Sequence, residues 1–315
     1  NLEKTGVFGR KLKYIEGGEY MKPVKFDYYS PKTVDEALTL LEEAGFDGKI
    51  IAGGQSLVPI MNMRLSSPEC LIDINQLHDL QFIEFDSDKV KIGALTRQAE
   101  VESSDVVQKH LGLLSEAVPF IGHVQTRNRG TFGGSLVHAD PTAEIPLSLM
   151  ALGGTLHIAS KEEVREVNVE DFFITYLTTD IMPNEMLTEI HIPIEQERNG
   201  YSFYEISRRH GDFALVASAC QLTIDHLDRI TNVRLVLGGV EATPLLIEGA
   251  NEWMKGEVLS DSLLQKVEDI VDEMVDPESD IHATAEYRRH LSKKLAVRTV
   301  KSAYERARGE ANERS

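Results

Sequence analysis

The chain has 315 residues, of which 42% are hydrophobic and 27% are charged, a composition typical of a globular protein with two or three modules. Its 33 basic and 51 acidic residues give a formal net charge of -18. This charge disfavours nucleic acid and anionic membranes as partners, because both bind cationic patches. An anionic cofactor would have to be held locally, by backbone amides in glycine-rich turns.

Residues 1–21 lack the apolar core and cleavage site of a signal peptide, and Met21 resembles a natural start. We therefore treat residues 1–21 as an extension or an expression remnant. No run in the sequence approaches the roughly 20 consecutive apolar residues of a membrane span. We expect a cytoplasmic protein without a membrane span and without a nucleic-acid partner.

The sequence has two cysteines, Cys70 and Cys220, and each lies in an apolar, strand-like run. Both are expected to be buried thiols. Because an iron–sulfur cluster normally takes four thiolates, this chain cannot hold one alone. The ten histidines are scattered without the spacing of zinc ligands, so we expect no metal site.

The first predicted module spans residues 22–78. The segment Thr33 to Glu36 fits a capping box, and apolar residues at helical spacing predict a helix that ends at Gly45. Short apolar runs at residues 49–52 and 71–74 predict two strands. These elements form a small α/β unit.

The second predicted module spans residues 79–197. Its expected regular elements are a strand at 90–95, a helix at 106–118, and strands at 155–159 and 187–192. Residues 122–146 are dense in glycine and polar side chains, so we expect this segment to be long and irregular.

The third predicted module spans residues 198–309, followed by a tail at 310–315. Its expected elements are strands at 203–206, 215–224 and 233–240, then helices at 263–274 and 283–308. A meander of strands followed by helices favours a separate α+β domain.

Two glycine pairs suit an anionic cofactor. Gly53-Gly54 follows an apolar strand, and Gly133-Gly134 lies between two hydroxyl side chains. Adjacent glycines allow positive φ angles and close backbone approach. Taken alone, the first pair also fits an ordinary turn after a strand, and neither pair matches the dinucleotide fingerprint or a P-loop. Together they favour two backbone nests on one pyrophosphate.

The segments around both pairs resemble the flavin motifs of the medium subunits of carbon monoxide dehydrogenases and related xanthine-dehydrogenase-family hydroxylases. Matching segments occur in the family's order at 52–56, 71–75, 93–96, 127–141, 208–214 and 286–291. The resemblance implies an α+β fold with a two-subdomain FAD-binding module of the PCMH or vanillyl-alcohol-oxidase type. Residues 22–78 and 79–197 would be FAD-binding subdomains 1 and 2. Residues 198–309 would be a C-terminal flavoprotein domain with an antiparallel sheet and helices.

The resemblance also implies which residues bind FAD. Those expected at the pyrophosphate are Ile51, Ala52, Gly53, Gly54, Gln55, Ser56 and Leu57 from the first loop, with Gly130, Thr131, Gly133, Gly134 and Ser135 from the second. Glu144 would contact the ribityl or adenosine region, and Leu187 would pack near the adenine or the ring system. Phe213 would lie against the isoalloxazine.

Two features leave alternatives open. Tyr204-Glu205 stands where many relatives carry a lysine, which puts a cationic contact to flavin or to an NAD-type acceptor in doubt. Arg127 and Arg129 could face the flavin phosphates, face a partner subunit, or be solvated loop side chains. No residue is expected to act as a catalytic acid or base, because the flavin supplies the redox chemistry.

The implied function is electron transfer within a molybdenum hydroxylase. A large subunit would carry molybdopterin and a small subunit the [2Fe–2S] clusters. This chain would pass electrons through FAD to a quinone, NAD+ or O2, in a complex expected to be a dimer of heterotrimers. One alternative is a free-standing FAD oxidoreductase with its own substrate pocket. Another is a scaffold subunit that has lost its flavin.

Overall fold

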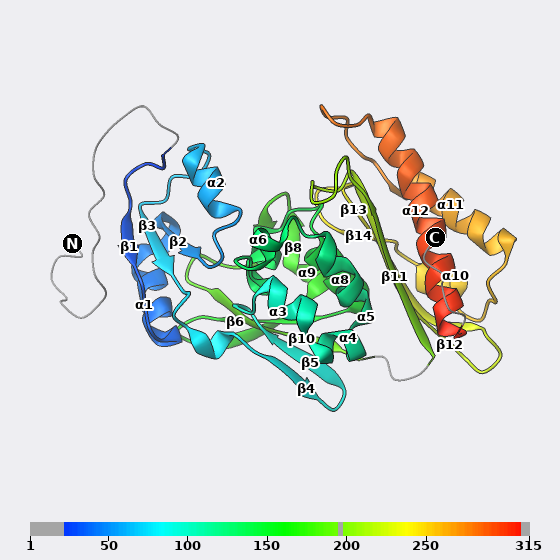
Figure 1. The fold of residues 1–315 in the computed structure, drawn as a ribbon, viewed down its shortest axis with the longest axis horizontal. Coiled ribbons are helices and arrows are strands. Elements are labelled where there is room, and N and C mark those ends of the chain that lie inside the picture. The colour runs from blue at the N-terminus through cyan, green and yellow to red at the C-terminus, as the bar shows by residue number, and fades with distance from the viewer. Residues whose placement is uncertain (1–21, 195–197, 310–315) are drawn as a thin grey trace.

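The computed structural model describes residues 22–194 and 198–309. Three main sheets follow one another along the long axis of the molecule, each with helices packed against it (Figure 1). The predicted extension at 1–21 and the tail at 310–315 lie outside the described residues.

The first sheet contains three short parallel strands in the order β1-β3-β2. The elements of this module are β1 (Asp27–Tyr29), α1 (Val34–Ala44), η1 (Gly45–Asp47), β2 (Gly48–Ile51), α2 (Leu57–Asn62), β3 (Cys70–Asp73) and η2 (His78–Leu80). Helix α1 packs on the sheet through Ala37, Leu38 and Leu41, which form a small core with Ile72. The sheet ends at the first glycine loop, between β2 and α2.

Helix α1 begins and ends as predicted. The Thr33 hydroxyl accepts a hydrogen bond from the N–H of Glu36 at 3.2 Å. The Glu36 carboxylate accepts from the N–H of Lys32 at 2.8 Å, one residue earlier than in a regular capping box. Gly45 ends the helix with a φ of 53°, a conformation that favours glycine.

The second sheet has five antiparallel strands in the order β4-β5-β10-β6-β7. Its strands are β4 (Ile83–Asp86), β5 (Lys89–Gly93), β6 (Thr155–Ala159), β7 (Val164–Asn168) and β10 (Met186–Pro193). Helices cover one face, where alternate residues such as Ile92, Ile158 and Ile190 are fully buried. The other face carries partly exposed polar side chains, among them His157 and His191.

The remaining elements of this module lie mainly between β5 and β6 in sequence. They are α3 (Gln98–Ser103), α4 (Asp105–His110), α5 (Gly112–Ala117), η3 (Val118–Phe120), α6 (Val124–Arg127), α7 (Phe132–His138), α8 (Glu144–Leu152), α9 (Val169–Phe172), β8 (Phe173–Thr175) and β9 (Thr178–Thr179). The predicted single helix at 106–118 is wrong, because the helical conformation is interrupted at Leu111, between α4 and α5. Gly112 starts α5 where a β-carbon would come within 2.1 Å of the Tyr201 ring.

The predicted irregular segment at 122–146 is also wrong, since α6, α7 and the start of α8 lie within it. Thr131 caps α7 by accepting from the N–H of Gly134 at 3.0 Å, and Phe132 is fully buried on the inner side of this helix. Ala139 ends α7 in the left-handed conformation, with a φ of 52°. Pro146 lies in the first turn of α8, where its missing N–H leaves no hydrogen bond unmade.

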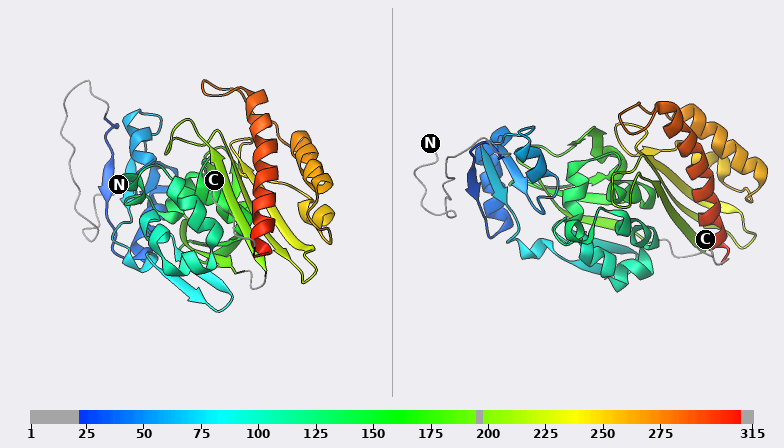
Figure 2. Two further views of the ribbon diagram at one scale, coloured as in Figure 1. Left: turned by 45° about the vertical axis from the view of Figure 1, so that its right-hand side comes forward. Right: turned by 45° about the horizontal axis from the view of Figure 1, so that its top comes forward.

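The third sheet is antiparallel, in the order β11-β12-β13-β14. Its elements are β11 (Asn199–Ile206), β12 (Val216–Ile224), β13 (Ile230–Gly238), β14 (Leu245–Leu246), α10 (Ala250–Met254), α11 (Asp261–Met274) and α12 (Ala285–Ala307). Helices α11 and α12 lie on the side of the sheet away from the second module (Figure 2). The other side packs on that module through Ala217, Ala219 and Val236.

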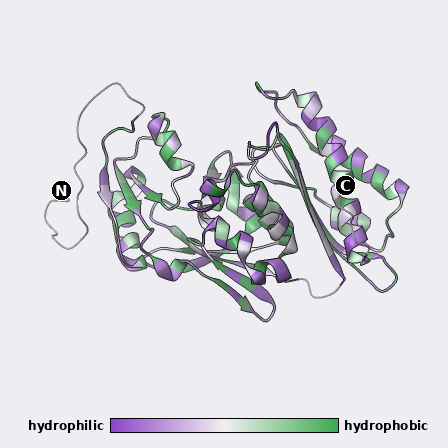
Figure 3. Cartoon of the chain, in the orientation of Figure 1, coloured by the Kyte–Doolittle hydropathy of each residue, from purple (hydrophilic) through white to green (hydrophobic). Residues whose placement is uncertain are grey.

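The sheet is therefore buried on both faces. Helices α11 and α12 mix hydrophilic and hydrophobic residues along their length, as expected for helices with one buried side (Figure 3). Near its end, α12 also reaches the second module, because Arg306 pairs with Glu116 of α5 at 2.5 Å and lies over the Tyr201 ring. These contacts fix the position of the C-terminal domain relative to the flavin motifs.

Candidate cofactor site

The two glycine loops lie in contact, although they are far apart in the sequence. A β-carbon on Gly53 would come within 2.3 Å of the Arg129 carbonyl oxygen and 2.8 Å of the Gly130 α-carbon. No real β-carbon tolerates such distances to backbone atoms, so only glycine fits at position 53. The structure thus brings together the two segments that the sequence predicted to share one pyrophosphate.

A hydrogen-bond network holds these loops together. Asn75, which follows β3, donates from its side chain to the Ala52 carbonyl oxygen at 2.8 Å. Arg97 donates to the Asn75 side-chain oxygen at 2.7 Å and to the Arg129 carbonyl oxygen at 2.5 Å. The guanidinium of Arg97 therefore connects both loops. Sequence reasoning missed this role, because only the position of Arg97 directly after the 93–96 segment hinted at it.

The first loop presents unused backbone donors. Across residues 22–194 and 198–309, no acceptor is found for the N–H groups of Gly53, Gly54, Gln55 and Ser56. Gly54 has a φ of 72°, in the left-handed region that favours glycine. Consecutive amides around such a turn form a concave nest that binds anions. This arrangement provides the local positive field that a pyrophosphate needs in an acidic protein.

The second loop differs, because the amides of Gly130 and of Phe132 to Ser135 already have acceptors. The N–H of Phe132 bonds to the Thr96 carbonyl at 2.8 Å, and the N–H of Gly133 bonds to the Ala94 carbonyl at 2.9 Å. Gly133 is required for packing, since a β-carbon there would come within 2.6 Å of the Ala94 β-carbon. What this loop can offer a ligand is the half-buried Ser135 hydroxyl and the surface of Gly134, which has no side chain.

Two carboxyl groups meet where the second module faces the C-terminal sheet. Glu144 is the first residue of α8, and burial raises its pKa to about 7. Glu205 lies on β11, and burial together with repulsion from Glu144 raises its pKa to about 8. Among the described residues, the Oε2 atom of Glu205 is buried without a hydrogen-bond partner. This unpaired oxygen would be satisfied by a ligand that donates to it or, once protonated, by a ligand that accepts from it.

The structure places the other predicted residues as follows. Leu187 lies on β10 beside a β-bulge and is buried in the core of the second module. Phe213, between β11 and β12, leaves 75% of its surface exposed, which is unusual for an aromatic side chain of this size. Its segment is anchored by Gly211, which has a φ of 85° and packs against His123.

Arg127 is not a solvated loop side chain, which was one of the roles considered for it. Its guanidinium is buried, pairs with Glu102 at 2.7 Å and donates to the Ile121 carbonyl oxygen at 3.1 Å. It therefore stabilises the base of the second loop. Arg129 has an exposed side chain, and its contribution to the network is its carbonyl oxygen.

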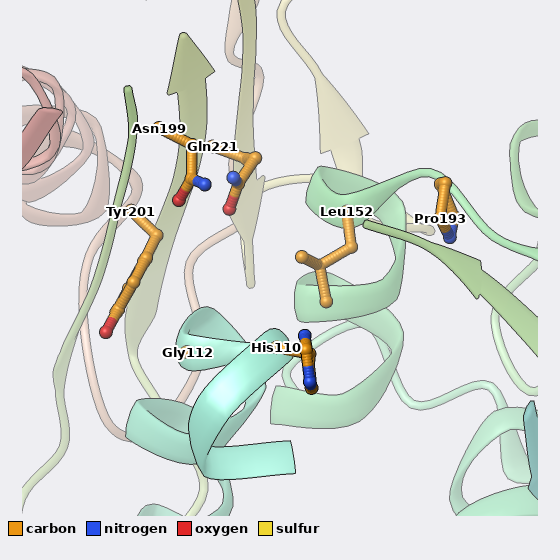
Figure 4. A pocket seen from close by; sticks show the side chains of 7 residues that line it. All are labelled: His110, Gly112, Leu152, Pro193, Asn199, Tyr201 and Gln221. Atoms are coloured by element: carbon orange, nitrogen blue, oxygen red, sulfur yellow. The ribbon is translucent and has the colours of Figure 1, made fainter. Parts of the chain in front are cut away.

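A small pocket lies apart from these loops, between the second module and the C-terminal sheet (Figure 4). It is lined by His110, Gly112, Leu152, Pro193, Asn199, Tyr201 and Gln221. Its volume of about 20 Å³ has room for about one water molecule. This pocket is therefore not a cofactor site.

Comparison with protein families decides the identity of the fold. Residues 24–195 match the family described as the FAD binding domain in molybdopterin dehydrogenase. The chain belongs to this family. Residues 201–303 match a second family, described as the CO dehydrogenase flavoprotein C-terminal domain. The chain is thus an oxidoreductase flavoprotein component with an FAD-binding domain, and both glycine loops lie within that domain.

Relatives of the flavoprotein match it over nearly its whole length. The alpha subunit of the 6-hydroxypseudooxynicotine dehydrogenase complex of Paenarthrobacter nicotinovorans is 37% identical over 91% of this chain and 97% of that protein. A chain of carbon monoxide dehydrogenase from Hydrogenophaga pseudoflava superposes with a TM-score of 0.88, at 32% identity, over 90% of this chain and 99% of that one. A chain of quinoline 2-oxidoreductase from Pseudomonas putida 86 superposes with a TM-score of 0.86, at 34% identity, over 91% of this chain and 99% of that one. These likenesses confirm the predicted family and α+β fold class.

No helix within residues 22–194 and 198–309 of the flavoprotein combines the length and the apolarity that crossing a bilayer requires.

Loss of the Arg97 guanidinium should weaken flavin binding without unfolding the flavoprotein. The Arg97→Ala variant loses two charge-assisted hydrogen bonds that join the loops. We therefore expect the Kd for FAD to rise about tenfold. Titration of the flavin-free variant with FAD, followed by flavin fluorescence, measures this change. Arg229→Ala, which removes an ion pair with Asp225 in a distant turn, is the matched control. Equal FAD affinity in both variants would contradict a role for Arg97.

Proposed function

We propose that this chain holds FAD non-covalently and is the electron-transferring medium subunit of a molybdenum hydroxylase. In this role it passes electrons from [2Fe–2S] clusters of a partner subunit to a terminal acceptor, a quinone, NAD+ or O2. The observation that carries the proposal is the contact between the two glycine loops, with four unused amides beside it. The cofactor would supply the redox chemistry, and the protein its binding and orientation.

The residues of the site fit this cofactor. The amides of Gly53 to Ser56 would hold the pyrophosphate, flanked by Ile51, Ala52 and Leu57. The second loop would add Gly130, Thr131, Gly133, Gly134 and Ser135. Glu144 would contact the ribityl or adenosine region, and Leu187 would pack near the adenine or the ring from within the sheet. Glu205, in its neutral form, would present a hydrogen-bond donor where many relatives have a lysine.

The proposed partners are a molybdopterin-binding large subunit and an iron–sulfur small subunit, assembled as a dimer of heterotrimers. Relatives support the division into subunits, since they are named as a subunit alpha and as medium chains of dehydrogenases. Cys70 and Cys220 are both buried. Two thiols are also fewer than the four ligands that an iron–sulfur cluster takes. Substrate selectivity would then belong to the molybdenum subunit.

The free-standing oxidoreductase is less well supported. Such an enzyme would need several polar groups facing the flavin ring from the C-terminal domain, and Glu205 would supply one of them. Val216 and Ala217, which follow the Phe213 segment, are fully buried in the sheet core. The scaffold alternative requires a lost flavin site, whereas the nest at Gly53 and Gly54 is intact.

The isolated chain should be redox-active and yet catalytically incomplete. We expect purified chain to show the visible spectrum of oxidised flavin and to be bleached by dithionite. On its own it should oxidise no purine, aldehyde or CO, because the proposed substrate site lies on the molybdenum subunit and reaches the flavin only through the iron–sulfur clusters. Adding the iron–sulfur and molybdenum subunits should restore turnover. A colourless protein would favour the scaffold, and substrate turnover by the isolated chain would favour the free-standing enzyme.

Phe213 is proposed to cover the isoalloxazine from one side. In Phe213→Ala, the ring should become more accessible, so that flavin fluorescence rises and reduced flavin reacts faster with O2, while FAD content is unchanged. Phe46→Ala is a matched control, because Phe46 is also a highly exposed phenylalanine, at 92%, in the first module. Identical fluorescence and O2 reactivity in the two variants would rule out this position for Phe213.

A further inference from the structure

The outer face of the five-stranded sheet carries a histidine pair that the flavin site does not use. His157 on β6 and His191 on β10 lie side by side, with His157 Nε2 at 2.9 Å from His191 Nδ1. Glu189 is the register partner of His157 across the same two strands. Sequence reasoning predicted no metal site, because the histidines are scattered along the chain without the spacing of zinc ligands. The antiparallel pairing of β6 and β10 brings them together.

Each imidazole of the pair also faces a carboxylate with its second nitrogen. His191 Nε2 lies 3.1 Å from Glu189 Oε1. His157 Nδ1 lies 3.8 Å from Glu166 Oε1, on the neighbouring strand β7, and 3.9 Å from Glu189 Oε1. Glu189 therefore lies near both imidazoles, so that one carboxylate and two ring nitrogens are available to a single ion.

The distances suit a metal ion. One ligand atom from each of His157, Glu189 and His191 lies within 4.8 Å of the other two. Two nitrogens bound to one tetrahedral Zn²⁺ at 2.0–2.1 Å are separated by about 3.3 Å. The 2.9 Å hydrogen bond between the two imidazoles would have to open for an ion to enter between these nitrogens. The two histidine side chains are 12% and 15% exposed, so their orientation is restrained by packing.

The surroundings leave room for the rest of a coordination sphere. His157, His191 and Glu166 line a cavity on this face of about 560 Å³. The same cavity is bordered by the carboxylates of Asp88, Glu170 and Asp171, and by the ammonium of Lys89. Lys91, the register partner of His191, is held by Asp86 at 2.8 Å. Acidic side chains thus outnumber basic ones around the cavity, which favours a cation.

We propose that His157, His191 and Glu189 form a binding site for a divalent transition-metal ion of the Zn²⁺ type. Two imidazoles and one carboxylate make up a ligand set that such ions prefer, with the remaining position open to water in the cavity. The ion would connect β6 to β10 across the outer face of the sheet. It would lie on the opposite face of the sheet from the helices that carry the second glycine loop, and would be independent of flavin.

Metal binding can be measured on the flavin-loaded full chain after treatment with a chelator. We expect calorimetric titration with Zn²⁺ to give one ion per chain and the melting temperature to rise when the ion is present. Replacing either imidazole, in His157→Gln or His191→Gln, should weaken Zn²⁺ binding at least tenfold (about 1.4 kcal/mol) and remove the increase in melting temperature. Glu189→Gln should weaken binding by a similar factor.

The controls are His78→Gln and His226→Gln, which change exposed histidines on other parts of the molecule. Both should bind one Zn²⁺ with the affinity of the unchanged chain. Circular dichroism and flavin content verify that each variant is folded. The proposal is overturned if the unchanged chain retains no Zn²⁺, or if His157→Gln and His191→Gln both bind it as tightly as the controls.

Discussion

We expect the Gly53→Ala variant to lose most of its flavin while keeping its fold. The single added methyl group would lie 2.3 Å from the Arg129 carbonyl oxygen, so the two loops must move apart. Overpacking of this kind costs about 1–3 kcal/mol, which corresponds to a weakening of FAD binding by about fivefold to 150-fold if the strain acts on the bound state. Flavin content after gel filtration and the Kd from fluorescence titration measure the change.

Gly256→Ala is the matched control for this variant. Gly256 has a φ of 85°, so alanine is strained there, but its β-carbon would meet no atom within 4 Å. This control should lose some thermal stability and keep its full flavin content. If Gly53→Ala binds FAD as tightly as Gly256→Ala does, contact between the loops is not needed for the cofactor.

The flavin-free chain should become less stable as the pH rises from about 5 to 8. Glu144 and Glu205 have pKa values raised from 4.5 to about 7 and about 8 in the folded chain. In this range the folded chain therefore holds protons that the unfolded chain releases, and a higher pH favours unfolding. Both side chains keep some contact with water, so we expect the free energy of unfolding to fall by about 3 kcal/mol.

Urea denaturation at several pH values, with and without Glu205→Gln, isolates this effect. The variant removes one of the two titrating carboxyls, so its stability should vary roughly half as much between pH 5 and 8, and burial of Glu144 accounts for the rest. Glu248→Gln, an exposed carboxyl in the C-terminal domain, should retain the full pH dependence. The same slope in all three proteins would show that Glu205 is ionised and solvated when the chain is folded.

Sequence reasoning succeeded where the signal was local. The Thr33 cap and the Gly45 stop define α1 within one turn, so that helix needed no tertiary information. The burial of Cys70 and Cys220 followed from the apolar strands around them and is confirmed. The family resemblance rested on ordered short segments, which remain recognisable without any knowledge of how they meet in space.

Sequence reasoning failed where tertiary packing outweighs the local conformational preference of the residues. Gly133 and Gly134 disfavour a helix by about 1 kcal/mol each, yet α7 forms because Thr131 caps it and because Phe132 and Leu136 are fully buried. Arg97 has no recognisable pattern of its own, since its partners Asn75 and Arg129 come from separate parts of the chain. A contact of that kind follows from the tertiary fold alone.

The contact between Gly53 and Gly130 has a consequence for biosynthesis. During translation, the first loop leaves the ribosome well before the second, and their approach requires β3, β5 and α3 to be in place between them. Contacts so distant along the chain close late, because the entropy of the intervening segment must be lost first. Flavin capture should accordingly follow the folding of the second module, and a nascent chain that stops short of residue 130 would have no cofactor to stabilise it.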